Sequence, residues 1–245
     1  MSLRKLYAPA LLFSLTLLFA PSVLAQADAR ARAAAEIESL RAQIKAKEAV
    51  LLSPSKADRR EHADFLAQPD TGLARLLPRE KWDGKLSIRG GGAYYSFHAP
   101  SHEYDDTSDI GLEQGRLSVG FHGADFGFIY EVGDAPLEEV TLEHPSVRFL
   151  VSFVPPSTRP EVDKLWVGYS SAGMHSGEFV YRPSVTAAVG KTYVLRSISY
   201  GDADTLVAFR VVREDADGSV TLLWKKLKQF PKPSLERNVA SADGR

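Results

Sequence analysis

Residues 192–228 read TYVLRSISYGDADTLVAFRVVREDADGSVTLLWKKLK, which is three apolar runs joined by two polar turns. In the middle run, Val207, Phe209 and Val211 are separated by single residues. Side chains that alternate in this way point to opposite faces of a half-buried antiparallel strand. The connecting sequences GDAD and DADG are typical of hairpin turns. This stretch therefore predicts three consecutive antiparallel strands.

The same pattern recurs upstream, from Lys85 onward, as short runs rich in β-branched and aromatic residues between Gly, Pro and Asp turns. No amphipathic helix of useful length is evident between these runs, which argues against a parallel α/β sheet. The sequence predicts an all-β fold over residues 81–229, an antiparallel sandwich or flattened barrel of about eight or nine strands. The expected strands are Leu86–Phe97, Arg116–His122, Phe126–Val132, Arg148–Val154, Lys164–Tyr169, Glu178–Arg182, Thr192–Tyr200, Leu206–Arg213 and Val220–Lys228.

An N-terminal helical stem is expected at residues 26–52, which are rich in alanine and contain neither glycine nor proline. Its larger apolar residues have the three, four and seven spacing of a heptad seam. These residues are Ile37, Leu40, Ile44 and Leu51. Two interpretations remain open: a short coiled coil that forms an oligomer or a stalk, and a single helix packed on the domain.

Residues 53–80 are expected to form short helices that pack on the β domain. Ser55 and Asp58 have the spacing of a helix start. A further helical turn is expected at Leu73–Leu77, before Pro78. At the other end of the chain, the proline-containing polar residues 230–245 predict a flexible tail.

The first 25 residues have the pattern of a secretory signal peptide. A basic start is followed by the apolar run Leu11–Phe19 and by Val23-Leu24-Ala25, small residues suited to a peptidase cut before Gln26. We therefore expect a periplasmic or secreted protein with no stable membrane span after cleavage. An uncleaved anchor is the alternative, because the segment is nearly long enough to span a bilayer.

Composition limits the partners of the chain. Its 245 residues carry a net charge of −1 with no basic run, which does not favour nucleic acid as a partner. There is no cysteine, so neither disulfides nor a lipid-bearing N-terminal cysteine contributes. These features fit a bacterial envelope protein whose partners are envelope proteins or glycans, with a homo-oligomer formed through the stem.

The densest polar cluster is the loop 98–109, which follows a run of three glycines and two tyrosines. Glycine in a strand lets a ligand approach the backbone, and tyrosine rings can stack on a sugar. The acids of the loop are suited to calcium and its histidines to a transition metal, but the spacing matches no known metal motif; no cofactor is therefore assigned. The candidate ligand-binding residues are Tyr94, Tyr95, His98, His102, Glu103 and Asp109.

An enzymatic alternative rests on the same loop or on Ser170. The sequence around Ser170, GYSSAG, resembles a hydrolase nucleophile elbow with His175 nearby. An elbow needs a strand before the serine and a helix after it, and a strand is expected after this serine instead. We therefore favour a non-enzymatic binding or scaffold protein with no assigned catalytic residue, and keep an envelope hydrolase acting on glycan or ester as the alternative.

Overall fold

The computed structural model describes residues 20–236, with side chains from Gln26 onward. By its internal contacts the chain divides into two units, Met1–Ala49 and Val50–Arg245. The described part of the first unit belongs to helix α1 (Ala20–Leu52). The apolar run expected of the signal peptide, Leu11–Phe19, lies outside the described residues. No helix in the described part of the chain is long and apolar enough to cross a membrane.

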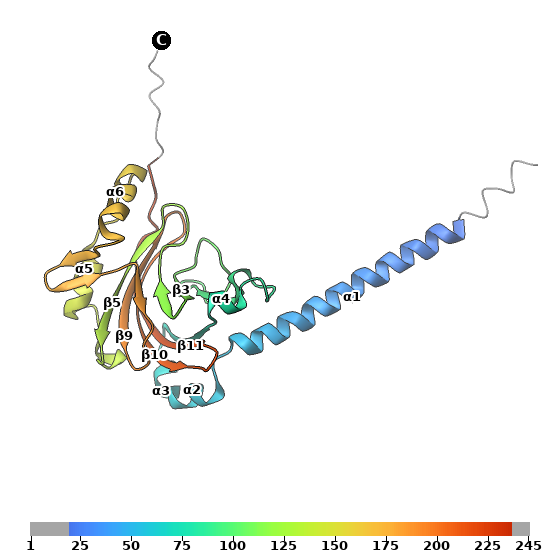
Figure 1. Cartoon of the computed structure of the whole chain (residues 1–245), viewed down its shortest axis with the longest axis horizontal. Coiled ribbons are helices and arrows are strands. Elements are labelled where there is room, and N and C mark those ends of the chain that lie inside the picture. The colour runs from blue at the N-terminus through green and yellow to red at the C-terminus, as the bar shows by residue number, and fades with distance from the viewer. Residues whose placement is uncertain (1–19, 237–245) are drawn as a thin grey trace, which may run out of the picture. The chain divides into compact units, whose positions relative to one another are not determined.

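The second unit is built on a five-stranded antiparallel sheet in the order β1-β11-β10-β9-β5 (Figure 1). Phe209 of β10 lies opposite Tyr193 of β9 and Trp224 of β11, so the three strands expected from residues 192–228 are confirmed. The strands of this sheet are β1 (Thr71–Leu76), β5 (Phe126–Gly133), β9 (Thr192–Ser199), β10 (Ala203–Glu214) and β11 (Val220–Gln229).

A second antiparallel sheet, in the order β2-β3-β4-β8, covers one face of the central sheet. Between the two sheets lies a hydrophobic core to which Phe209 and Leu195 contribute from the central sheet, and Ile110 and Leu117 from the second. The strands of the second sheet are β2 (Tyr94–Tyr95), β3 (Ile110–Glu113), β4 (Arg116–Ser118) and β8 (Ser184–Thr186).

Two helices and a small hairpin cover the opposite face of the central sheet. Val147 of α5 and Val162 of α6 pack there against Leu206 and Ala208 of β10. Figure 1 shows α5 and α6 on one side of the central sheet and β3 on the other. The covering elements are η2 (Leu137–Glu139), α5 (Pro145–Ser152), α6 (Arg159–Tyr169), β6 (Met174–Ser176) and β7 (Phe179–Tyr181).

The predicted all-β fold is therefore wrong: the structure is mixed α/β, with 32% helix and 31% strand. The strands expected at Arg148–Val154 and Lys164–Tyr169 are the helices α5 and α6. Their β-branched and aromatic residues favour a strand. The residues at the start of each segment, however, are those that typically begin a helix. Proline occupies the first turn of each helix, and Thr158 and Glu161 form a capping box on α6.

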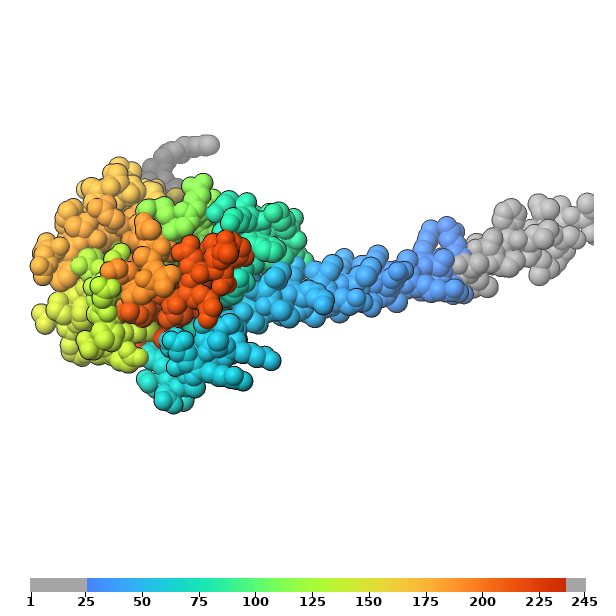
Figure 2. Space-filling view, turned by 60° about the horizontal axis from the view of Figure 1, so that its bottom comes forward, coloured from blue at the N-terminus to red at the C-terminus, as the bar shows by residue number. Residues whose placement is uncertain are grey.

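The segment between α1 and the second sheet also differs from the prediction. The helical turn expected at Leu73–Leu77 is largely the edge strand β1, in which Leu73 pairs with Leu223 and Leu76 with Val220. The helix expected to begin at Ser55 is present as two short helices, α2 (Lys56–Glu61) and α3 (Ala63–Leu66), and a further short helix, α4 (Arg79–Trp82), follows Pro78, where none is expected. Figure 2 shows α2 and α3, in light blue, beside the orange and red residues of β10 and β11.

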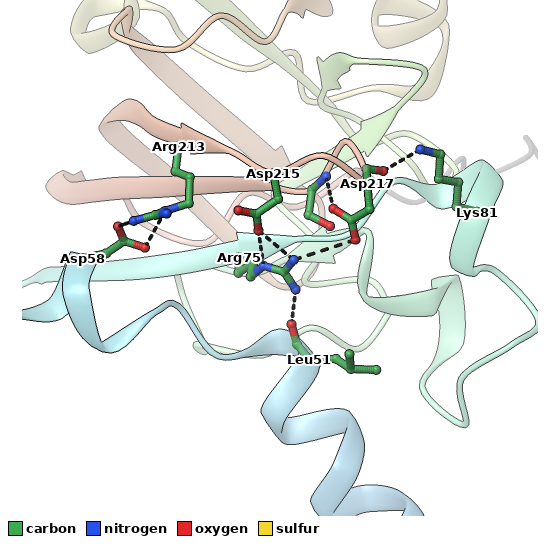
Figure 3. A network of polar contacts seen from close by, with 8 residues as sticks. Leu51, Asp58, Arg75, Lys81, Arg213, Asp215 and Asp217 are labelled. Carbon is green, nitrogen blue, oxygen red and sulfur yellow. Dashed lines mark hydrogen bonds and ion pairs between the residues drawn. The ribbon is translucent and has the colours of Figure 1, made fainter.

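Ion pairs connect these N-terminal segments to the central sheet (Figure 3). Asp58 at the start of α2 binds Arg213 of β10. Arg75 of β1 binds Asp215 at 2.8 Å in the β10–β11 turn, and it also donates to the backbone carbonyl of Leu51. The DADG turn therefore has a structural partner, in addition to closing the hairpin.

The strand expected at Leu86–Phe97 is much shorter than predicted. The glycine run forms a tight 3-10 turn, η1 (Arg89–Gly92), in which Gly90 and Gly91 have positive φ, and β2 comprises only two residues. A Cβ added at Gly91 would lie 2.4 Å from the backbone of Trp82. The glycines therefore allow two backbone segments to pack closely and do not indicate a ligand site.

The residues expected to begin a flexible tail are held on the domain as far as the structure describes them. The N–H of Phe230 donates to the Asp204 carbonyl at 2.9 Å, and the N–H of Glu236 donates to the Ser157 carbonyl at 2.7 Å. The Phe230 ring lies 3.7 Å from the guanidinium of Arg196. Phe230 and Leu235 thus pack, partly buried, against the core on this side of the sheet.

Candidate functional site

Asp109, one of the candidate ligand residues, is a structural residue. Its side chain is buried, and its Oδ2 accepts hydrogen bonds from the backbone N–H of Phe97 at 2.6 Å and of His98 at 3.3 Å. Burial raises the pKa of Asp109 even though these hydrogen bonds favour the charged form. The carboxylate closes the loop 98–109 from inside and does not face solvent.

Tyr95 and His102 are also engaged in packing. Tyr95 belongs to the core between the two sheets, and burial raises its pKa to about 12. The His102 ring lies edge-on to Tyr95 at 5.0 Å, and its Nε2 donates to the Arg75 carbonyl at 2.9 Å. Because burial lowers the pKa of His102, the neutral ring is favoured.

The other two loop candidates, His98 and Glu103, have exposed side chains. His98 Nδ1 lies 3.3 Å from Gln229 Oε1 on β11. Among the described residues no group of three or more His, Cys, Asp or Glu is placed to hold a metal ion. The loop therefore does not gather its acids and histidines into one site.

Tyr94 is largely buried, at 5% exposed, but it lines a surface hollow. Its ring is 4.3 Å from the Tyr104 ring and 5.0 Å, edge to face, from the Phe121 ring. Tyr104 in turn lies 4.5 Å from the His122 ring. Four rings from three segments therefore form a continuous aromatic wall.

The aromatic wall borders a groove that consists of two adjoining hollows, here called the aromatic groove. The first has a volume of about 340 Å³ and is lined by Tyr94, Tyr104, Phe121 and Trp166. The second, of about 300 Å³, lies between the loop 120–126 and α6. Gly120, Phe121 and Trp166 line both hollows, so the two adjoin along these residues.

Helix α6 positions Trp166 at the centre of the groove. The helix is fixed at its start by the capping box and near its end by Tyr169, whose hydroxyl donates to the Gly127 carbonyl of β5 at 2.7 Å. Trp166 lies edge-on to Tyr169 at 5.4 Å and remains 39% exposed. An indole held on a rigid helix and open to solvent is a ready stacking platform.

Charged and hydroxyl groups surround the rings of the groove. Arg79 lies 6.0 Å from the Tyr94 ring and 3.5 Å from Glu113, and Arg159 pairs with Asp163 at 2.8 Å. All of these ion pairs are solvent-exposed, so they can exchange partners at low cost. Ser118 and Ser184 contribute further polar groups to the first hollow.

Asp125 in the second hollow has a perturbed protonation equilibrium. Burial raises its pKa to about 6, although the backbone N–H of Tyr200 donates to its Oδ1 at 2.9 Å. Asp106 and Asp202 raise the pKa further by charge repulsion. The groove therefore contains a carboxyl group whose pKa is raised to about 6.

Ser170 does not have the surroundings of a hydrolase nucleophile. It is the C-cap of α6, so it follows a helix, whereas a nucleophile elbow places the serine after a strand and before a helix. Its backbone N–H donates to the Trp166 carbonyl at 2.9 Å, and its side chain is exposed. The resemblance of GYSSAG to an elbow is one of sequence only.

Sequence reasoning missed Phe121 and Trp166 as site residues and counted Tyr104 only as part of a polar loop. Trp166 falls in the strand predicted at Lys164–Tyr169, which is part of helix α6. The Thr158–Glu161 capping box was the available signal for α6, and thus for the face that carries the indole. No sequence pattern brings residues 94, 121 and 166 together, because the contact depends on the packing of distant segments.

Comparisons with known proteins do not assign this groove. No protein-family model matches the chain, and neither a curated protein nor a solved structure is significantly similar to it.

Proposed function

We propose that this chain is an exported, non-enzymatic binding protein of the bacterial envelope, and that its aromatic groove binds a glycan. The observation that carries the proposal is the exposed Trp166 indole at the shared rim of two hollows, the first of which is also lined by the tilted ring pair of Tyr94 and Tyr104. Sugar rings have apolar C–H faces and a rim of hydroxyl groups. Aromatic platforms fit the faces, and surrounding carboxylates, guanidinium groups and hydroxyls fit the rim.

The enzymatic alternative has less support. Asp109 is occupied by backbone donors and Ser170 ends a helix, so neither feature that suggested a hydrolase forms a reactive arrangement. Export is proposed from the signal pattern of the first 25 residues, and the envelope location follows from it.

Thermal shift and calorimetric titration of the purified chain test the proposal. The panel consists of soluble peptidoglycan fragments and neutral oligosaccharides, with calcium as a separate arm for the cation expected from the loop. A glycan that binds the folded protein raises its melting temperature by mass action. Trp166→Ala is expected to weaken that binding about tenfold, since a lost stacking contact is worth about 1 kcal/mol or more.

Val167→Ala is the matched control, because Val167 is the adjacent residue, is 76% exposed and does not line either hollow. It should bind as the unaltered protein does. Failure of every glycan to bind, or equal binding by Trp166→Ala and Val167→Ala, would refute the glycan groove.

A further inference from the structure

The large apolar side chains in the first part of α1 lie along one stripe. Between Gln26 and Lys47 the only such residues are Ile37, Leu40 and Ile44; every other residue there is alanine or polar. The three are 49%, 50% and 49% exposed. Spacings of three and four place them on one face of the helix. The described helix therefore presents a continuous apolar stripe to solvent over two turns.

We propose that this stripe, here called the α1 seam, pairs with the same seam of a second copy in a parallel two-stranded coiled coil. In heptad notation, Ile37 and Ile44 occupy a positions and Leu40 occupies the d position between them. Isoleucine at a with leucine at d favours two parallel strands over three or four. The combination of residue types thus specifies both the occupant of the seam and the number of strands. The inference does not rest on the glycan proposal.

The charges beside the seam favour the parallel orientation. In a parallel pair the g residue of one helix faces the following e residue of the other, which places Glu36 opposite Arg41 of the second copy on both sides. In an antiparallel pair with Ile37 packed on Leu40, Arg41 would face Ala34 and Glu36 would face Gln43. Attractive charge pairs therefore form only in the parallel arrangement.

Little stability is lost within α1 when Arg41 exchanges its own ion pair for one with the second copy. Arg41 binds Glu38 of its own helix at 2.7 Å, but both side chains are 70% exposed, and such a pair contributes little to stability. Ala33 and Lys47 occupy the d positions on either side of the apolar layers. A small residue at one end and a polar residue at the other discourage a shift of the two helices by one heptad.

Cysteine cross-linking tests the orientation, since the chain has no cysteine of its own. Leu40→Cys places one thiol in the seam, where a parallel in-register pair brings the two thiols together. Ala42→Cys, at the outer f position, is the matched control. After mild oxidation, Leu40→Cys should give at least tenfold more disulfide-linked dimer than Ala42→Cys on a non-reducing gel. Equal cross-linking at the two positions would overturn the parallel in-register pair.

Light scattering tests the number of strands in the purified chain. The unaltered protein should have twice the monomer mass at high concentration, and Ile44→Asp should have the monomer mass. Lys45→Asp changes the neighbouring b position, adds the same residue type and should remain a dimer. A monomer at all concentrations, a trimer or tetramer, or a dimer that survives Ile44→Asp would each overturn the proposal.

Discussion

The two faces of the central sheet are buried in chemically different ways. Toward the second sheet, the hydrophobic core consists of aliphatic and aromatic side chains, such as Phe209 stacked on Tyr193 at 5.1 Å, and the buried Asp109 carboxyl on this side is bound by backbone N–H groups of its own loop. Toward the helices, the core also contains the ion pair of Arg196 and Asp204, with side chains 1% and 2% exposed. A sheet satisfies its backbone groups through strand pairing, whereas a helix end does not.

Arg196 supplies hydrogen-bond donors to the backbone carbonyls at the end of α5. Besides binding Asp204 through two nitrogens at 2.8 and 2.6 Å, its guanidinium donates to the carbonyls of Leu150 at 2.5 Å and Phe153 at 2.7 Å. These carbonyls belong to the last turn and C-cap of α5, where no intrahelical donor is available. The comparison shows that a helical cover brings unpaired backbone acceptors into the core, and that a buried arginine can satisfy them.

The largest expected effect on this comparison comes from Asp204→Ala. The substitution leaves the Arg196 guanidinium buried without its counter-charge, and we expect a loss of about 4 kcal/mol in the free energy of unfolding. Urea unfolding measures this loss. Asp134→Ala is the control, because Asp134 pairs with Lys191 while 82% exposed, and it should cost less than about 1 kcal/mol. Similar losses for the two variants would show that the Arg196 pair is not truly buried.

The second prediction tests whether both faces are fully packed. Leu195 and Leu206 are both buried leucines, the first on the face toward the second sheet and the other on the face toward the helices. Leu195→Ala and Leu206→Ala should each cost about 3 kcal/mol, from lost burial and the cavity left behind. Urea unfolding measures both losses, and each of the two variants serves as the control for the other. A cost below about 1 kcal/mol for Leu206→Ala alone would show that its face is half-solvated, as the sequence pattern had suggested.

The smallest expected effect is a pH dependence from Asp125, next to the helix-covered face. Its pKa of about 6 in the folded protein exceeds its ordinary value of 3.8, so the folded state holds more protons between these pH values. The free energy of unfolding must therefore fall as pH rises through this interval. Asp125→Asn removes this contribution while keeping an acceptor for the Tyr200 N–H.

We expect Asp125→Asn to gain about 1 kcal/mol relative to the unaltered protein between pH 4 and pH 7, the full shift being reduced because the carboxyl group is partly solvated. Thermal unfolding at both pH values measures the change. Asp109 has a pKa raised in the same direction, but it is present in both proteins and cancels in the difference. A difference that does not change with pH would contradict the raised pKa of Asp125.

The same two faces explain which parts of the fold were predictable. The alternation around Phe209 and the hairpin turns report strand pairing directly, because they depend on neighbours in sequence. The second layer was not predictable in this way: residues 148–154 are rich in β-branched and aromatic types, yet form α5 and its C-cap. The strand around Phe209 is antiparallel as predicted, but its second face is solvated less than the alternation suggests. Arg210 and Val212 are partly exposed, whereas Leu206 and Ala208 on the same face are buried.

Of the residues that line the aromatic groove, the sequence predicts one, Tyr94, as a ligand-binding residue. Tyr94 follows the glycine run and does line the aromatic groove, whereas Asp109 and His102 face inward. Polar residues in a loop have the same local sequence whether they bind a ligand or the loop's own backbone. Trp166 reaches the groove through α6, which depends on tertiary packing and on a capping box between Thr158 and Glu161.

The pairing of β1 with β11 has a consequence for how the domain is completed. Thr71 lies opposite Lys225, so within residues 20–236 the first strand of the sheet pairs with the last and with no other strand. Contacts between residues so distant in sequence form slowly. A chain that is still being synthesised leaves β1 without its partner β11 until the final strand emerges. A protease that removes residues 219–236 would likewise leave β1 without its partner strand. Resistance of β1 to cleavage therefore indicates that β11 is present and paired with it.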